Sequence, residues 1–365
     1  MLKKSLHALT WIVAVLIIAL VGYFCYLQIH YYRIADKQTL SIKNPQKQQL
    51  QTNKTYTLST YNIGFGAYSP DFTFFMDKNQ MKDGPETQGK NGKAKDKETV
   101  LHNTTGVINT VKKLNSDFMF FQEVDTNSSR SYHVNQVKQI THTFNNYANV
   151  FANNFHSVFL AYPLTDPHGA VQSGLLSLSR YRIDSATRRK YPISQALISK
   201  FFDLDRCFVV LRLPVSNNKQ LVLINSHMSA YDKGGKMRAK QLALLNSVMR
   251  QEVKAGNYVI VGGDFNHALG QDMLTHFANQ QEVPDWVSVL TNHDLTNGIH
   301  FVRAQNTNQV PTCRGTDIAY TPNKTYQTVV DGFLVSNNVA ATATNIQTNY
   351  AYSDHNPVQL KFTLK

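Results

Sequence analysis

The chain of 365 residues has too few cysteines to be held together by disulfide bonds. It contains three cysteines and no Cys-x-x-Cys pair, which excludes a disulfide-built scaffold and gives no indication of a zinc–thiolate site. Acidic residues are also scarce, since 24 Asp and Glu stand against 37 Lys and Arg and leave a net charge of +13. This basic excess favours a polyanionic partner or an anionic membrane. With 42% apolar residues the chain can still bury a large core, so wholesale disorder is excluded.

The first thirty residues are almost free of charge. No Lys, Arg, Asp or Glu occurs between Lys4 and Arg33, and residues 9–27 are almost wholly apolar. As a helix this stretch would be about 28 Å long, close to the hydrocarbon thickness of a bilayer. We therefore expect a transmembrane anchor over residues 9–29. The bulky aromatic residues around Cys25 do not match a signal-peptide cleavage site, which favours an uncleaved anchor.

The flanking charges give the expected orientation of this anchor. Lys3 and Lys4 favour a cytoplasmic N-terminus over residues 1–8, although the basic residues between 33 and 43 favour the opposite orientation. The polar residues 30–55 predict a solvated stalk, whose lysines could also touch anionic lipid headgroups. We expect a single-pass protein of the cell membrane, with a folded domain over 56–365 outside the cell.

Beyond residue 55, β-rich segments alternate with amphipathic ones. Short apolar segments predict strands at 57–61, 118–122, 174–179, 208–213, 221–226, 258–262, 328–335 and 358–362. Three-and-four-residue apolar spacing predicts helices at 99–114, 133–144 and 236–254. The polar stretch 77–103 predicts a long loop. The mixture indicates one α/β domain with a partly antiparallel sheet. We expect Cys207 and Cys313 to be buried free thiols, although they could pair in an oxidising compartment.

Polar residues gather where the predicted strands end. They are Asn62, Gln122-Glu123, Asn225-Ser226-His227, Asp264-Phe265-Asn266, Asp331 and Asp354-His355-Asn356. Each group alone is an ordinary turn or cap. Because a mixed sheet can bring several strand ends to one edge, together they predict one site of carboxylates, amides and imidazoles. Such an oxygen-rich set suits Mg²⁺, Mn²⁺ or Ca²⁺.

Six ordered motifs carry a family resemblance. They are Thr60-Tyr61-Asn62-Ile63, Phe121-Gln122-Glu123-Val124, Asn225-Ser226-His227-Met228, Gly263-Asp264-Phe265-Asn266, Val330-Asp331-Gly332-Phe333 and Ser353-Asp354-His355-Asn356-Pro357. In this order the chain resembles the endonuclease/exonuclease/phosphatase superfamily over 57–365. The resemblance implies a four-layer α/β/β/α sandwich of two packed mixed sheets, here preceded by one N-terminal transmembrane helix. It also implies a divalent-metal-dependent phosphodiesterase that uses Mg²⁺ (or Mn²⁺ or Ca²⁺).

The resemblance also assigns the metal ligands and the base. Glu123 matches the leading metal ligand, Asn62 would help to hold the metal or the phosphate, and Asp354 matches a second acidic position. His355 matches the general base, and Asp331 the partner that orients it.

The other matched residues would act on the water and the phosphate. Asp264 and Asn266 match the pair that orients the attacking water and binds the phosphate. His227 could protonate the leaving oxygen or stabilise the phosphate, and its division of labour with the general base is a hypothesis. Arg314 could contact the phosphate, although an ordinary surface arginine is the alternative.

Several substrates remain open. We favour a nuclease acting on DNA or RNA, because the chain is basic. The expected anchor supports a sphingomyelinase-like enzyme or another lipid or small-molecule phosphoesterase as an alternative. A surface protein that only binds is a further alternative, and no protein partner is evident from the sequence.

Overall fold

The computed structural model describes residues 2–193, 204–230, 235–277 and 280–365. Its core is two packed mixed sheets. The seven-stranded sheet consists, in spatial order, of β1 (Gln38–Thr39), β8 (Ser185–Lys190), β9 (Cys207–Pro214), β10 (Gln220–His227), β11 (Tyr258–Asp264), β17 (Asp331–Ser336) and β14 (Ile299–Val302). The six-stranded sheet consists of β18 (Val339–Asn345), β19 (Val358–Leu364), β2 (Thr55–Asn62), β5 (Phe118–Asp125), β7 (Gly169–Ser179) and β6 (Ala148–Leu160). Within each sheet one pair is parallel, β10 with β11 and β2 with β5, and the other neighbours are antiparallel.

Alternating apolar residues hold the two sheets face to face. Leu58 and Phe120 of the six-stranded sheet pack in one buried cluster with Leu211, Leu223 and Ile260 of the seven-stranded sheet. Because side chains of a strand alternate between its faces, the intervening residues point outward to the helices. This arrangement gives the inner two layers of the sandwich.

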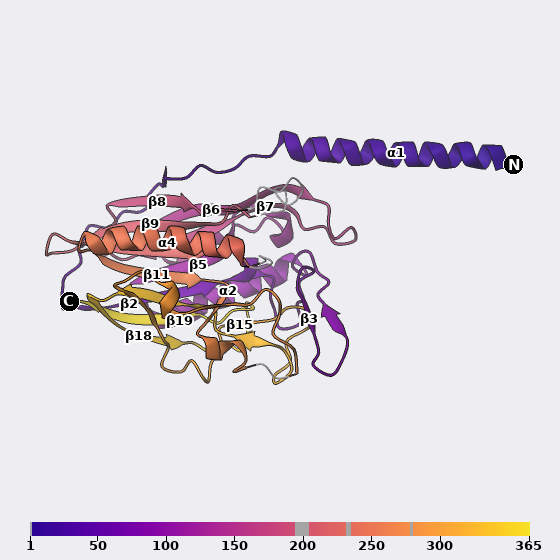
Figure 1. Ribbon diagram of the computed structural model, residues 1–365. Helices are drawn as coiled ribbons and strands as arrows, with labels where there is room; N and C mark the ends of the chain where they lie inside the picture. The colour runs from indigo at the N-terminus through magenta and orange to yellow at the C-terminus, as the bar shows by residue number, and fades with distance from the viewer. Residues whose placement is uncertain (1, 194–203, 231–234, 278–279) are drawn as a thin grey trace.

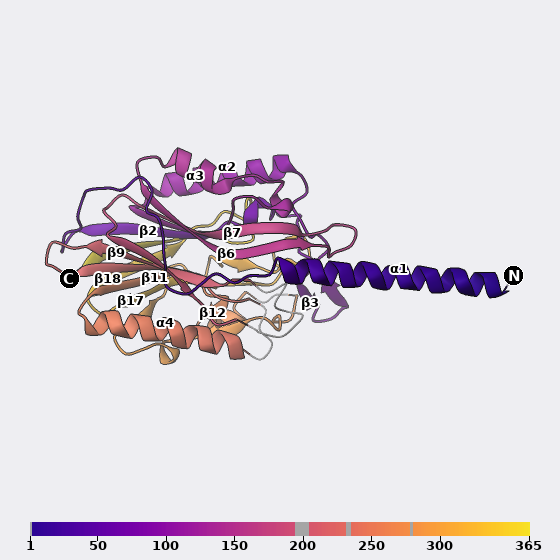
Figure 2. The ribbon, with the colours of Figure 1, turned by 90° about the horizontal axis from the view of Figure 1, so that it is seen from above.

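Helices form the outer layers (Figure 2). On one face α2 (Lys97–Leu114) and α3 (Gln136–Thr143) pack on the six-stranded sheet, and on the other α4 (Lys236–Lys254) packs on the seven-stranded sheet. Asp96 begins α2, since its carboxylate accepts the N–H of Thr99 at 2.7 Å. Asn115 ends α2 in the left-handed conformation, with φ 46°. The four-layer α/β/β/α fold expected from the family resemblance is confirmed.

Short elements lie beyond the main sheets. They are the two-stranded pairs β3 (Lys78–Gln80) with β4 (Glu86–Gln88), β12 (His267–Leu269) with β13 (Ser288–Leu290) and β15 (Cys313–Arg314) with β16 (Gln327–Thr328), and the 3₁₀ turns η1 (Gly64–Gly66), η2 (Ser129–Ser131), η4 (Gln271–Leu274) and η5 (Asn292–Asp294). The expectation of a loop over 77–103 is wrong, because this stretch contains β3, β4 and the first turns of α2.

The expectation of buried free thiols is confirmed, because Cys207 and Cys313 are both buried and unpaired.

The first helix, α1 (Leu2–Ile29), projects from one end of the domain (Figure 1). The helix over residues 3–29 is long and apolar enough to cross a membrane. Its most apolar stretch has a mean hydropathy of 2.5, and none of that stretch is buried. A signal sequence near the N-terminus would meet the same criterion.

Residues 30–55 differ from the solvated stalk that we expected. β1 pairs with β8, Lys43 pairs with Asn149, and Leu50 is fully buried in the core between the sheets. Leu40 and Ile42 pack partly against the same core. Lys and Gln dominate the composition of this stretch and led to the expectation of a stalk. A few apolar residues among them are enough to hold the stretch on the domain.

Candidate active site

The topology brings the polar strand ends together at one edge of the sandwich. His227 and Asp264 are register partners at the ends of the parallel strands β10 and β11. Asp331 is the register partner of Asp264, because β17 begins where the antiparallel β11 ends. His355 stands just before β19, whose first residues lie beside the end of β2 and therefore beside Asn62. Residues from 62 to 355 thus meet at one place, as the sequence predicted.

The side-chain amide of Asn62 lies at the centre of this group. Its Nδ2 is 3.0 Å from Asp264 Oδ2, 3.3 Å from Glu123 Oε1 and 3.4 Å from His355 Nε2. Its Oδ1 accepts the backbone N–H of Gly64 at 3.0 Å, which fixes which way the amide faces. Asn62 therefore ties together three of the predicted functional side chains.

His355 and Asp331 form a buried pair. Nδ1 of His355 lies 2.8 Å from Asp331 Oδ2, so the Nδ1–H donates to the carboxylate and Nε2 faces the cavity. Burial raises the pKa of Asp331. Burial alone would lower the pKa of His355, but the charge of Asp331 and of the neighbouring Asp354 and Asp264 raises it well above its usual value. His355 therefore keeps its proton for as long as those carboxylates carry unbalanced negative charge.

Asp264 is held from two sides. Its Oδ1 accepts the backbone N–H of Asn266 at 2.8 Å, and its Oδ2 lies 3.3 Å from His227 Nε2. Burial and the charge of Arg206 lower the pKa of His227 well below its usual value, so the ring is neutral. Asn266, at φ 49°, donates its Nδ2–H to the carbonyl of Met228 at 2.9 Å.

Two further carboxylates fit a hard divalent cation. Glu123 lies at a β-bulge of β5, with φ 56°, and this bulge turns its side chain into the cavity. Burial and the negative charge of Glu123 raise the pKa of Asp354 to about 7. A divalent cation would balance the negative charge of Glu123 and Asp354, so these two carboxylates would hold one. Asn62 presents its N–H groups to this side of the site, and its role as a metal ligand stays a prediction.

Ligand-type atoms of Asp264, Asp331 and His355 also lie within 4.8 Å of one another. Nδ1 of His355 is already engaged by Asp331. Nε2 of His355 and the carboxylate oxygens face the same space, so these three residues form a second set of atoms with the spacing of metal ligands.

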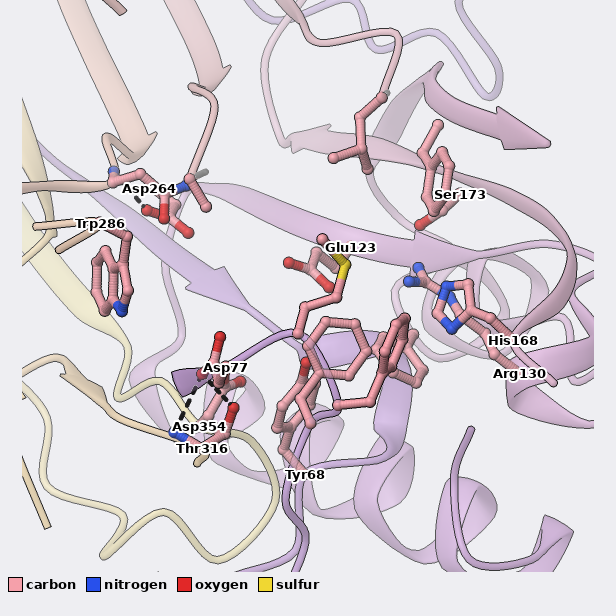
Figure 3. A pocket seen from close by; sticks show the side chains of 18 of the residues that line it. Tyr68, Asp77, Glu123, Arg130, His168, Ser173, Asp264, Trp286, Thr316 and Asp354 are labelled. Atoms are coloured by element: carbon pink, nitrogen blue, oxygen red, sulfur yellow. Dashed lines mark hydrogen bonds between the residues drawn. The ribbon is translucent and has the colours of Figure 1, made fainter. Parts of the chain in front are cut away.

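The site opens into a cavity of about 630 Å³. In Figure 3, Asp264 and Asp354 lie on one side of this cavity and His168 and Arg130 on the other, with Glu123 between them. Its remaining wall is largely aromatic or apolar: Phe65, Tyr68, Phe74, Phe75, Met76, Phe155, Leu160, Tyr162 and Trp286. This wall could not be expected from the sequence, because its residues come from separate loops and strands and follow no period.

Arginines at the cavity are engaged by the protein itself. The guanidinium of Arg314 donates to the carbonyls of Gly315 at 3.1 Å and Ser69 at 3.0 Å, so it braces two loops. Its contact with a phosphate stays a prediction. Arg130, which sequence reasoning missed, donates to Asp125 at 2.9 Å and lies 3.9 Å above the ring of Phe65.

The site combines carboxylates suited to bind a divalent cation with a buried His–Asp pair, and it lies at the edge of two packed mixed sheets. These features are those of a metal-dependent hydrolase of phosphoesters. The chain belongs to the endonuclease/exonuclease/phosphatase family, whose sequence profile matches residues 59–355. No curated protein matches the chain.

Solved structures share the fold at low identity. TDP2 from Caenorhabditis elegans has 15% identity and a TM-score of 0.54, with 86% of this chain and 76% of that chain covered. An endonuclease/exonuclease/phosphatase from Beutenbergia cavernae has 14% identity and a TM-score of 0.56, with 86% and 72% covered. Danio rerio TDP2, solved with a single-strand DNA product, has 14% identity and a TM-score of 0.52, with 85% and 100% covered. At these identities the likeness shows the fold alone.

Proposed function

We propose that the chain hydrolyses phosphodiesters with the help of a divalent cation, with Mg²⁺ expected and Mn²⁺ or Ca²⁺ as alternatives. The observation that carries this proposal is the contact of Asn62 with Glu123, Asp264 and His355, because it joins the expected metal side and the expected acid–base side of the site. A divalent cation held there would neutralise the charge of the phosphate.

The residues of the chain would handle the water and its protons. Once the charge of the neighbouring carboxylates is balanced, Nε2 of His355 takes a proton from the attacking water, and Asp331 stabilises the resulting imidazolium. Asp264 and Asn266 orient the water and the phosphate. The water oxygen bonds to phosphorus and the bond to the leaving oxygen breaks. The neutral ring of His227 stabilises the phosphate, and solvent protonates the leaving oxygen.

A soluble phosphodiester tests the reaction itself. The full chain should hydrolyse bis(p-nitrophenyl) phosphate with Mg²⁺ and lose this activity with a chelator. His355→Ala removes the base, so we expect kcat to fall roughly 10²- to 10⁴-fold. His142, which is exposed on α3, gives the matched control: His142→Ala should leave kcat unchanged. In Glu123→Gln, half-maximal activity should require more Mg²⁺, because a charged ligand is lost.

Full activity of His355→Ala, or turnover that ignores the chelator, would contradict the proposal. If no phosphoester is turned over at all, a protein that only binds becomes the better description.

Two substrate classes have support from different observations. The net charge of +13 and the DNA product bound to Danio rerio TDP2 support a nuclease. The aromatic wall of the cavity supports a lipid or another phosphodiester that carries an apolar group. Plasmid DNA and sphingomyelin vesicles, each offered with Mg²⁺ and with chelator, separate the two classes.

We further propose that α1 spans the cell membrane, with residues 1–8 in the cytoplasm and the catalytic domain outside. Its length and its apolar composition support the span, and Lys3 and Lys4 support the orientation. Protease protection of the N-terminus in intact cells tests the orientation.

A further inference from the structure

The end of α1 is fastened to the domain by a short, well-anchored segment. The ring of Tyr32 stacks on His156 with centroids 3.8 Å apart, and Arg33 Nη1 lies 3.2 Å from Asp205 Oδ1. Arg188 Nη1 donates to the carbonyl of Ala35 at 3.3 Å. These contacts begin three residues after Ile29, where α1 ends, so no long flexible linker separates α1 from the domain. The contacts therefore fix the orientation of the domain relative to α1.

A connection of the domain lies beside the apolar part of α1 itself. The Tyr23 hydroxyl donates to the carbonyl of Phe159 at 3.0 Å and accepts the N–H of Ala161 at 3.1 Å. Leu27 is buried, with 4% of its surface exposed. Tyr23 lies six residues before the end of α1, or about 9 Å along the helix axis. The connection between β6 and β7 therefore reaches to the depth of the apolar helix rather than stopping above it.

Residues 159–164, which are the end of β6 and the first part of this connection, are apolar and open to their surroundings, whereas Asp166 further along forms an ion pair with Lys93 at 3.4 Å. Residues 159–164 contain no charged side chain. Phe159 is 44% exposed, Tyr162 57% and Leu164 83%. Side chains of this kind at the level of an interfacial tyrosine match the groups that insert by roughly 5–10 Å into the boundary between headgroups and acyl chains.

The same connection forms the rim of the catalytic cavity. Tyr162 and Met76 line the cavity and are both exposed, and the ring of Tyr162 packs on Phe75 with centroids 5.5 Å apart. Figures 1 and 2 show α1, the β6–β7 connection and β3 at the same end of the domain, with the C-terminus at the opposite end. The mouth of the cavity therefore faces the side from which α1 leaves.

We propose that residues 159–164 insert into the membrane beside α1 and seat the mouth of the cavity on the bilayer, so that the site takes its phosphodiester from lipid headgroups. The inference rests on α1 spanning the membrane and, for the substrate, on the proposed phosphodiesterase activity. A phosphate enters toward Glu123, and the apolar part of the same lipid stays against the aromatic wall and the bilayer.

A label at the tip of the connection tests the insertion. In the full chain with Cys25→Ser, which removes the exposed cysteine, Leu164→Cys carries an environment-sensitive fluorophore in phosphatidylcholine vesicles. The matched control is Ser216→Cys, which is exposed before β10, at the end of that strand opposite His227. A lipid-borne quencher should quench the label at 164 several-fold more than the label at 216, and aqueous iodide should do the reverse. Equal iodide quenching at both positions would refute the insertion.

Hydrolysis by the full chain in vesicles tests the access route. Leu164 does not line the cavity, so Leu164→Asp should leave hydrolysis of soluble bis(p-nitrophenyl) phosphate unchanged. Release of phosphorylated headgroup from vesicles of phosphatidylcholine, phosphatidylglycerol and sphingomyelin should fall about tenfold, because a buried charge opposes insertion.

The two assays separate the possible failures. Cleavage of the soluble ester and of DNA without any headgroup release would refute the lipid substrate and leave the phosphodiesterase intact. No cleavage of the soluble ester would instead refute the phosphodiesterase, and the fluorescence result would still decide the insertion.

Discussion

His168 is a neutral base enclosed by the aromatic wall of the cavity. Its ring contacts Phe65, Phe74 and Phe155, and its Nδ1 donates to the carbonyl of Gly92. Burial lowers the pKa of His168 to about 3. In an unfolded chain the same group would titrate near its usual value of about 6.5. Between these values the unfolded state binds a proton that the folded state does not.

This difference gives a pH dependence of stability with a definite sign. The contribution of His168 is complete above about pH 6.5 and is lost as the pH falls, by about 1.4 kcal/mol per pH unit until about pH 3. His168→Gln keeps a donor for Gly92 but cannot titrate. Urea unfolding between about pH 6 and pH 4 should therefore show a steeper loss of the free energy of unfolding in the wild type than in the variant. Parallel pH profiles would show that His168 is already charged in the fold.

Single residues of the acid–base site were predictable, and those of the wall were not. Asp264 and His355 stand next to short apolar strands in motifs that the sequence displays directly. Phe75 and Tyr162 stand in segments without periodicity, and only the folded chain brings them together at 5.5 Å. That Arg314 lies near the site could be predicted from the sequence. Its hydrogen-bond partners could not, because they are backbone carbonyls and no sequence pattern indicates them.

Among the elements, the pairing of β10 with β11 sets the geometry of the site. Gly263 belongs to β11, one residue before Asp264, and is the register partner of Ser226 in β10. Its φ is 143°, and an added Cβ would lie 1.9 Å from the carbonyl oxygen of Ser226. The strand therefore requires glycine here, for both its conformation and its close approach.

Gly263→Ala should consequently separate the two strand ends. We expect the free energy of unfolding to fall by roughly 2–4 kcal/mol from overpacking and backbone strain. Phosphodiesterase activity should fall with it, because Asp264 moves with the backbone. Gly22→Ala is the control, since its Cβ meets no atom within 4 Å. Calorimetry and kcat for a soluble phosphodiester measure the two effects. Wild-type values of both would mean that the strands tolerate the methyl group.

The elements found from the sequence were those with strong local patterns. The helix expected at 236–254 is α4 without a shift in either boundary, because its apolar spacing and Gly256 define it. No strand was expected at β6, β8 or β18. Their residues are rich in Asn, Ala, Thr, Arg or Lys, and their β conformation depends on pairing with neighbouring strands.

In the whole molecule, the folded unit begins before the boundary that composition suggests. The expected domain starts at residue 56, yet β1 adds to the edge strand β8 and Leu50 fills the core between the sheets. The same segment joins α1 to the domain, so the stability of the domain and its proposed seating on the membrane depend on one stretch of chain. Its few apolar residues are diluted among Lys and Gln, so average composition could not reveal them.

Two truncations test where the folded unit starts. A chain of residues 31–365 keeps β1, Leu50 and the contacts of Arg33, whereas 56–365 loses all of them. We expect 56–365 to be less stable by roughly 4 kcal/mol, from the loss of buried Leu50 and of the partly buried Leu40 and Ile42. It should also aggregate more readily, because the edge of β8 is uncovered. Urea midpoints and light scattering measure both effects. Equal midpoints would mean that residues 31–55 lie on the domain without stabilising it, and the fixed orientation of α1 would then lack its support.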